Sequence, residues 1–141
     1  MNALNVFLDA SALAMRYLNE AGSDRVERIV STASSVALSV ICFPEVVSGL
    51  TRLRREGKLS PQQYTENKLA LIRDVKHSII IPVTEEIVAR AVDVLERWPL
   101  RSSDALHEAC AAEWQADLFT SADERQCQAA RGYGLRVEAL A

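Results

Sequence analysis

Four acidic residues follow predicted strands or open predicted helices, positions where side chains from distant segments can meet. Asp9 ends the first apolar run of the chain, NVFLD, and Glu45 follows the second run after a few residues. Asp104 opens the helical stretch SSDALHEACAAEW, and Asp123 follows the run LFTSA. Each acid alone has an ordinary explanation, because carboxylates also cap helices and stabilise turns. A functional interpretation therefore depends on whether the fold gathers them at one place.

The pattern of apolar residues predicts an α/β fold with a mostly parallel sheet. Short apolar runs predict strands, and helical periodicity fills the segments between them. The predicted strands are 6–8, 36–41, 79–83, 118–120 and 135–137. Strands that alternate with helices need crossover connections, which cover both faces of a parallel sheet with helices. Because the 141 residues contain neither repeats nor a linker, we expect one domain over residues 1–141.

Residues typical of helix starts support these elements. Asp24 and Glu27 have the spacing of a capping box, and Ser60 precedes a proline suited to the first helical position. Thr84 stands before two glutamates, which the helix dipole favours in a first turn. Pro44 is also compatible with the first position of a helix. Helices are therefore expected to begin near each of these positions.

A parallel sheet brings three of the acids to one edge. Asp9, Glu45 and Asp123 follow strands, and the carboxyl ends of parallel strands lie together, where open α/β sheets bind ligands. Asp104 joins them if its helix begins at that edge and runs antiparallel to the strands. Asp117 precedes its strand, roughly 20 Å from Asp123 at the rise of an extended chain. Asp117 is therefore assigned to the opposite edge and excluded from the site.

Carboxylates gathered in one crevice repel one another, and proximity alone raises some of their pKa values. A divalent cation removes this repulsion. Ligation by oxygen alone, without histidine or cysteine, suits Mg²⁺ or Mn²⁺ rather than zinc. Magnesium commonly shares its coordination between a few carboxylates and substrate phosphates. The four acids therefore predict hydrolysis of phosphodiester bonds by water activated at a metal ion.

The sequence resembles the PIN-domain ribonucleases in successive blocks. These blocks are VFLDASALAMRYLNEAGS, FPEVVSGLTRLRREGKLS and LRSSDALHEACAAEWQADLFTSADERQCQAARGYGLRV. The resemblance is greatest to the VapC-like toxins of bacterial and archaeal toxin–antitoxin pairs, and it runs from about Asn5 to the C-terminus. Each acid is a weak signal by itself, whereas the order of the acids together with D-A-S-A-L-A, D-A-L-H and T-S-A-D-E-R is specific.

The resemblance implies a PIN-like three-layer sandwich with the strand order 3-2-1-4-5. The acidic positions of the family fall on the acids selected above, which are Asp9, Glu45, Asp104 and Asp123. The implied activity is that of a toxin, an endoribonuclease that depends on Mg²⁺ or Mn²⁺ and cleaves RNA. The implied partners are a cognate antitoxin protein and a second copy of the chain in a homodimer.

Three further residues lie near the acids, and two of them, Ser11 and His107, have two interpretations each. Ser11 could reach a metal-associated water or the substrate, or it could cap the first helix. Ser121 stands where the family often has threonine, and its hydroxyl keeps the oxygen that could hold a water molecule. His107 is a catalytic base by residue type, but its place behind Asp104 favours a packed or hydrogen-bonded helix residue.

Basic residues cluster in TRLRREGK, and no lysine follows Lys76, although the net charge is −3. Such clusters are usually solvated helix faces, but the planar guanidinium of arginine also suits contact with phosphate. The candidates for contact with the RNA backbone are Arg16, Arg52, Arg55 and Lys58.

Other enzyme classes that begin with a strand and an acid do not fit. A HAD-like phosphatase needs a second aspartate at position 11, which is Ser11, and a receiver domain needs a late lysine, whereas none follows Lys76. The sequence also lacks G-x-x-x-x-G-K-[ST] and G-x-G-x-x-G. One alternative stays open, a catalytically inactive PIN-like scaffold that binds RNA or protein without cutting.

The composition is typical of a cytoplasmic protein. The three cysteines are odd in number and lack C-x-x-C spacing, which indicates reduced thiols rather than disulfides or metal ligands. A run of about 18 uncharged apolar residues is missing, so no membrane span is expected. The apolar start contains Asp9 and has no basic leader, unlike a signal peptide.

Overall fold

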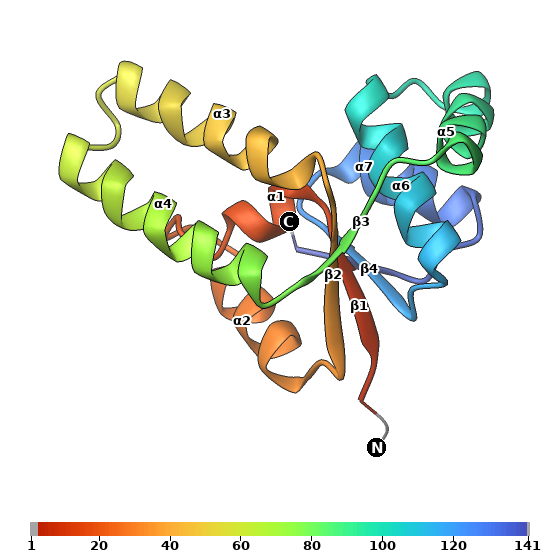
Figure 1. The fold of residues 1–141 in the computed structure, drawn as a ribbon, viewed down its shortest axis with the longest axis horizontal. Helices are drawn as coiled ribbons and strands as arrows, with labels where there is room; N and C mark the ends of the chain where they lie inside the picture. The colour runs from red at the N-terminus through yellow and green to blue at the C-terminus, as the bar shows by residue number, and fades with distance from the viewer. Residues whose placement is uncertain (1–2, 141) are drawn as a thin grey trace.

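The computed structural model describes residues 3–140, which form a parallel sheet between two layers of helices (Figure 1). The strands are β1 (Asn5–Leu8), β2 (Ser35–Ser39), β3 (Ile79–Ile81), β4 (Leu118–Ser121) and β5 (Val137–Ala139). The helices are α1 (Ala10–Ala14), α2 (Ser23–Thr32), α3 (Cys42–Arg55), α4 (Pro61–Lys76), α5 (Glu85–Arg97), α6 (Ser102–Trp114) and α7 (Glu124–Gly132).

The strand order is β3-β2-β1-β4-β5, and every neighbouring pair is parallel. This order confirms the predicted α/β sandwich. Phe7 of the central strand β1 pairs with Ala37 of β2 on one side and with Phe119 of β4 on the other. Because β1 has a strand on each side, the residue that follows it emerges at the middle of the sheet edge. That residue is Asp9.

The two faces of the sheet carry two separate apolar cores. Val6 and Leu8 pack with α1 to α4, whereas Phe7 and Phe119 pack with α5, α6 and α7 (Figure 1). The rings of Phe7 and Phe119 stack with their centroids 5.9 Å apart. Covering both faces requires apolar side chains on each, which explains why the strand is an unbroken apolar run rather than an alternating one.

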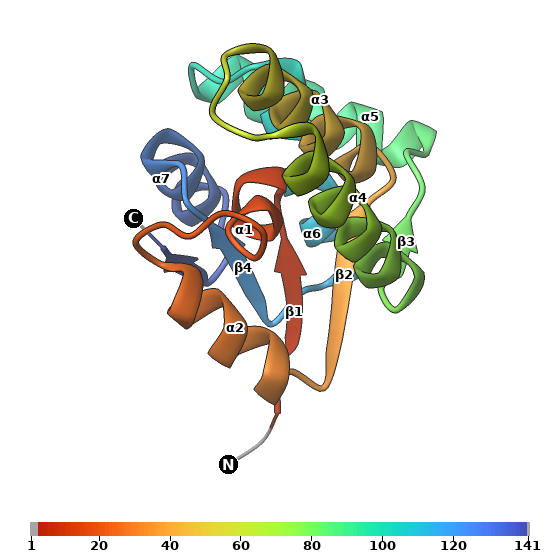
Figure 2. The ribbon, with the colours of Figure 1, turned by 90° about the vertical axis from the view of Figure 1, so that its left-hand side faces the viewer.

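Helices α3 and α4 form an antiparallel pair that extends beyond the sheet (Figures 1 and 2). The predicted start of α4 is confirmed, since Ser60 and Gln63 form a reciprocal capping box. The turn between the two helices contains Lys58, and the guanidinium of Arg54 lies 4.5 Å from the ring centre of Tyr64. The basic cluster of Arg52, Arg54, Arg55 and Lys58 thus lies on this helical pair and its connecting turn.

Of the other three predicted helix starts, two are wrong in position and one is right. Helix α2 begins at Ser23 with Gly22 as its N-cap, so Asp24 lies inside the first turn and forms no capping box with Glu27. Pro44 is the third residue of α3 rather than the first. The first turn tolerates it because those amides lack partners within the helix. Thr84 does cap α5 as expected.

All five strands differ from their predicted limits, β1 and β4 by one residue and the other three by two residues at one end or more. Strand β2 ends at Ser39, because the chain turns into α3 two residues before the apolar run is over. Strand β3 ends at Ile81 rather than at 83, and β5 lies at Val137–Ala139 rather than at 135–137. Among the helices of residues 3–140, none is long and apolar enough to cross a membrane.

Candidate active site

Asp9 lies at the carboxyl end of the central strand and is the N-cap of α1. Its Oδ1 accepts hydrogen bonds from the Ala12 amide at 2.9 Å and from the Ser11 hydroxyl at 2.7 Å. The side chain is only 3% exposed. Asp9, and not Ser11, therefore caps the first helix, so the capping interpretation of Ser11 is wrong.

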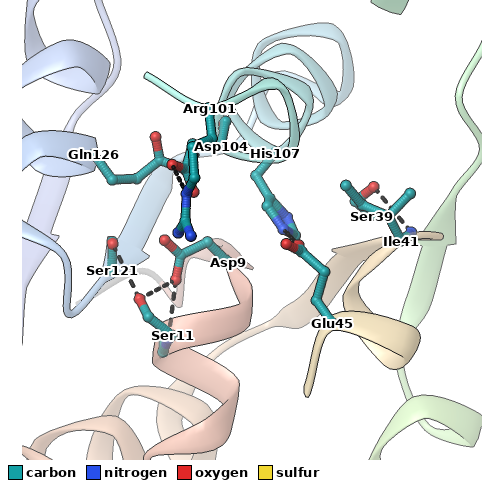
Figure 3. Close-up of polar contacts among 11 residues, drawn as sticks. Asp9, Ser11, Ser39, Ile41, Glu45, Arg101, Asp104, His107, Ser121 and Gln126 are labelled. Carbon is teal, nitrogen blue, oxygen red and sulfur yellow. Dashed lines mark hydrogen bonds and ion pairs between the residues drawn. The ribbon is translucent and has the colours of Figure 1, made fainter. Parts of the chain in front are cut away.

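A chain of hydroxyl groups connects Asp9 to the neighbouring strand. The oxygens of Ser11 and Ser121 are 3.2 Å apart (Figure 3). Either hydroxyl can be the donor in this contact. The amides of Ala122 and Asp123 donate to these two hydroxyls at 2.9 and 3.0 Å. The pair of serines thus fixes the end of β4 against the start of α1.

Burial raises the pKa of Asp9 above its ordinary value. The positive charge of His107 and the hydrogen bonds from Ser121, Ser11 and the Ala12 amide lower it, but they do not outweigh the loss of hydration. The carboxylate of Asp9 is therefore stabilised by too little positive charge from the protein. An added cation at this place would restore its ordinary acidity.

Glu45 and His107 face each other from α3 and α6 (Figure 3). The Nε2–H of the buried imidazole donates to Oε1 of Glu45. Burial alone raises the pKa of Glu45, but the hydrogen bond and charge of His107, with the charge of Arg101, lower it below its usual value. Among the described residues, the other ring nitrogen of His107 has no partner. His107 is thus a buried, hydrogen-bonded helix residue that holds Glu45 as an anion.

Asp104 is the third residue of α6, so its helix does begin at the carboxyl edge of the sheet. The Nε of Arg101 donates to Oδ2 of Asp104 at 3.4 Å, and Figure 3 shows the Arg101 side chain extending from there toward Asp9. The Gln126 side chain donates to the backbone oxygen of Asp104 at 3.0 Å, which joins α7 to α6. In a capping box, the Gln126 side chain would instead bond back to the Asp123 amide at the start of α7, and it does not do so here.

Asp123 is the N-cap of α7, and its Oδ1 accepts from the amides of Arg125 and Gln126 at 2.9 and 3.3 Å. Asp117 lies at the other end of the sheet, where it accepts from the Asn5 amide at 2.8 Å. Its exclusion from the site is therefore correct.

Two hollows at the carboxyl edge meet at Arg101. One, of about 310 Å³, is lined in part by Ser11, Glu45 and Arg52. The other, of about 420 Å³, is lined in part by Asp104 and Asp123. Arg101 lines both. Three of the acids therefore line these two hollows, Glu45 in one and Asp104 and Asp123 in the other, whereas Asp9 lines neither.

The donor set at this edge fits a hard divalent cation by its chemistry. The available groups are carboxylates and hydroxyls, which are the ligands that Mg²⁺ and Mn²⁺ prefer, and the raised pKa of Asp9 indicates missing positive charge. Within residues 3–140, however, no three acidic, histidine or cysteine side chains converge on one point. The acids are instead engaged by protein groups, which a cation would have to displace.

The basic candidates differ in how freely they are displayed. Arg16 forms ion pairs with Glu27 at 2.8 Å and with Asp74 at 3.2 Å, so its guanidinium group is already paired with two carboxylates. Arg52 and Glu45 both line the hollow of about 310 Å³. Arg55 is exposed at the end of α3, and Lys58 is exposed in the turn that follows. Arg52 is therefore the candidate nearest to the acids.

The sequence analysis did not single out two residues at this edge. Arg101 stands three positions before Asp104, and Glu108 stands four positions after it. Both spacings place side chains on the same helix face, which is a signal that the sequence does contain. Whether such a face is buried, as it is for Glu108, depends on the packing of α6 between its neighbours.

Comparison with known proteins agrees with this geometry. A family model described as the PIN domain matches residues 6–132. The chain belongs to the PIN domain family. None of the curated proteins compared with this PIN domain matches its sequence.

Solved structures with the same fold include toxins of toxin–antitoxin systems. VapC20 of Mycobacterium tuberculosis, described as a toxin that cleaves the sarcin–ricin loop, is 18% identical with a TM-score of 0.67, covering 92% of this chain and 95% of VapC20. VapBC2 of Rickettsia felis, bound to a DNA fragment from its promoter, is 12% identical with a TM-score of 0.69, covering 96% and 98%. FitAcB of Neisseria gonorrhoeae is 16% identical with a TM-score of 0.68, covering 94% and 95%. This PIN domain therefore resembles VapC toxins in its fold.

Proposed function

We propose that this PIN domain is a metal-dependent endoribonuclease, the toxin of a toxin–antitoxin pair. The observation that carries the proposal is the buried carboxylate of Asp9 at the middle of the sheet edge, with acids from α3, α6 and the start of α7 around it. The proposed metal-binding and catalytic acids are Asp9, Glu45, Asp104 and Asp123.

The residues of the chain would divide the work as follows. A bound Mg²⁺ or Mn²⁺ supplies positive charge at the phosphate and activates water for attack. Ser11 and the Ala12 amide hold one oxygen of Asp9 in a fixed direction, which leaves Oδ2 to face a cation. His107 keeps Glu45 ionised and oriented by its hydrogen bond.

The proposed substrate is RNA, whose phosphates would contact basic side chains beside the hollows. Arg52 is supported by its place beside Glu45, and Arg55 and Lys58 by their exposure on the same helical pair. Arg16 is retained as a candidate only if RNA displaces its two carboxylate partners.

The proposed partners follow from the solved structures with the same fold. VapBC-5 of Mycobacterium tuberculosis, which has the same fold, is described as a member of the VapBC family of toxin–antitoxin systems, and this supports a cognate antitoxin for this chain. We also propose a homodimer, acting in the cytoplasm, as the resemblance to VapC-like toxins implies. Residues 1–141 are proposed to act as one domain.

Cleavage of a labelled total RNA preparation tests the activity. The purified protein should cleave RNA with Mg²⁺ or Mn²⁺, and EDTA should abolish cleavage. Asp9→Asn should abolish it too, because asparagine keeps the hydrogen-bond acceptor for Ala12 and removes the charge. Asp93→Asn is the matched control, since Asp93 forms an exposed ion pair with Arg97 on α5. Cleavage that persists in EDTA or in Asp9→Asn would refute the proposal.

The second candidate function, a scaffold that binds RNA or protein without cutting, is favoured by one observation. Within the described residues the acids do not converge, and each is engaged by the protein itself. RNA binding at a defined site without cleavage, under all divalent cations tried, would support the scaffold.

A further inference from the structure

Glu108 is a buried acid that the proposed reaction does not use. It lies on α6, one helical turn beyond Asp104, and its side chain is 0% exposed. Neither carboxyl oxygen has a hydrogen-bond partner among the described residues. The helix around it is apolar, with Ala105, Ala109 and Cys110 all fully buried. Glu108 is therefore a polar group with nothing in its surroundings to satisfy it.

Such a residue lowers the stability of the fold. Burying an unpartnered polar group costs about 1 to 3 kcal/mol in proteins, and an ionised carboxylate costs more. Leucine would fill a similar volume on α6 without this cost. The presence of glutamate is thus not explained by packing, and it has to be explained by the charge that the side chain can carry.

The charged groups that act on Glu108 are Asp104 on its own helix and Asp9 from the end of β1. Burial first, and then these two negative charges, raise the pKa of Glu108 to about 8. Without an added cation, the carboxyl group is therefore protonated near pH 7. Both acids that suppress its charge belong to the proposed cation site.

We propose that Glu108 is a fifth carboxyl group of the cation-binding site, which strengthens cation binding through its charge from behind Asp9 and Asp104. This inference rests on the proposed function, because it assumes that a divalent cation binds at this edge. Asp104 and Glu108 are four residues apart on one helix, so their Cβ atoms are about 5–6 Å apart. Glu108 acts here as an electrostatic residue and not as a direct ligand, since its side chain is fully buried on α6.

The size of the effect follows from Coulomb's law. A negative charge near a divalent ion attracts it, and the attraction is stronger in a partly buried site than in water. Glu108 must lose its proton to carry this charge, and the free energy of that deprotonation offsets part of the attraction. We therefore expect loss of the charge to weaken cation binding by about tenfold or more.

Binding of Mn²⁺ to the full-length protein tests this without reference to cleavage. Titration calorimetry at pH 8 should show Mn²⁺ binding at least about tenfold weaker in Glu108→Gln and in Glu108→Leu than in the wild type. Glu113→Gln is the matched control, because Glu113 lies on the same helix but forms an exposed pair with Arg90. This control should bind Mn²⁺ like the wild type. Glu108→Gln keeps the shape of the side chain, so it serves if the leucine variant fails to fold.

The outcomes separate this inference from the proposed function. If wild-type cleavage needs a divalent cation but both Glu108 variants bind Mn²⁺ with unchanged affinity, the role of Glu108 is refuted and the nuclease proposal stands. If the wild type neither binds Mn²⁺ nor needs a cation for cleavage, both are refuted. Equal weakening in Glu113→Gln would also overturn the inference, because the effect would then belong to the net charge of α6.

Discussion

The stability of this PIN domain should depend on pH through Glu108, whatever the protein does. The pKa of this side chain rises from 4.5 to about 8 on folding, mainly because of burial. The folded state therefore holds the proton more tightly than the unfolded chain. Below about pH 4.5 the group is protonated in both states and costs nothing through its charge. Between pH 4.5 and 8 the free energy of unfolding should fall, and the loss is complete above pH 8.

The magnitude follows from the size of the change in pKa. At about 1.4 kcal/mol for each pH unit between 4.5 and about 8, the total loss is about 5 kcal/mol. Other acids contribute their own dependence, so the useful quantity is the difference between two variants. Glu108→Leu lacks the titrating group. Its free energy of unfolding should exceed that of the wild type by an amount that grows as the pH rises from 5 to 8.

Urea denaturation followed by circular dichroism, with EDTA present to remove cations, measures this difference. Wild type, Glu108→Leu and the exposed control Glu113→Gln should be compared at pH 5, 6, 7 and 8. A difference between wild type and Glu108→Leu that stays constant over this range would refute the reasoning. It would mean that Glu108 ionises as readily in the fold as in the unfolded chain.

Three further predictions concern other parts of the molecule. Asp9→Asn should raise the melting temperature at pH 7 in EDTA, because burial raises the pKa of Asp9 and its charge is then a cost; a clearly lower melting temperature would show that the acid is a structural cap. Arg101→Gln should tighten Mn²⁺ binding in calorimetry, because the guanidinium competes for Asp104; unchanged affinity would show that Arg101 does not compete. Ser60→Ala should lower the free energy of unfolding by about 1 kcal/mol in urea denaturation through loss of the helix cap, and RNA cleavage should be unchanged.

The sheet could be predicted from the sequence because its strands are short apolar runs separated by helical segments. The limits of the strands could not be predicted in the same way. The run from Val36 to Ile41 is apolar throughout, yet the chain leaves the sheet after Ser39 and Ile41 already caps α3. Hydrophobic periodicity does not separate a buried strand from the buried first turn of the helix that follows. Likewise Asp24 and Glu27 fit a capping box by spacing, but Glu27 pairs with Arg16 instead.

In the candidate site, too, only some of the acidic residues could be placed from the sequence. The acids that follow strands could be placed at one edge, because the direction of parallel strands decides where their ends lie. Glu108 could not be placed, because acids within helices are usually on a solvated face. Its burial follows from a property of the whole helix: the buried residues of α6 include Ala105, His107, Ala109 and Ala111, which do not form a single stripe. A helix that is apolar around much of its circumference is largely enclosed by its neighbours, so an acid among its buried residues, such as Glu108, is buried, whereas Glu113 near the end of α6 is exposed. That criterion, applied to the residues after Asp104, separates Glu108 from the exposed glutamates of the other helices.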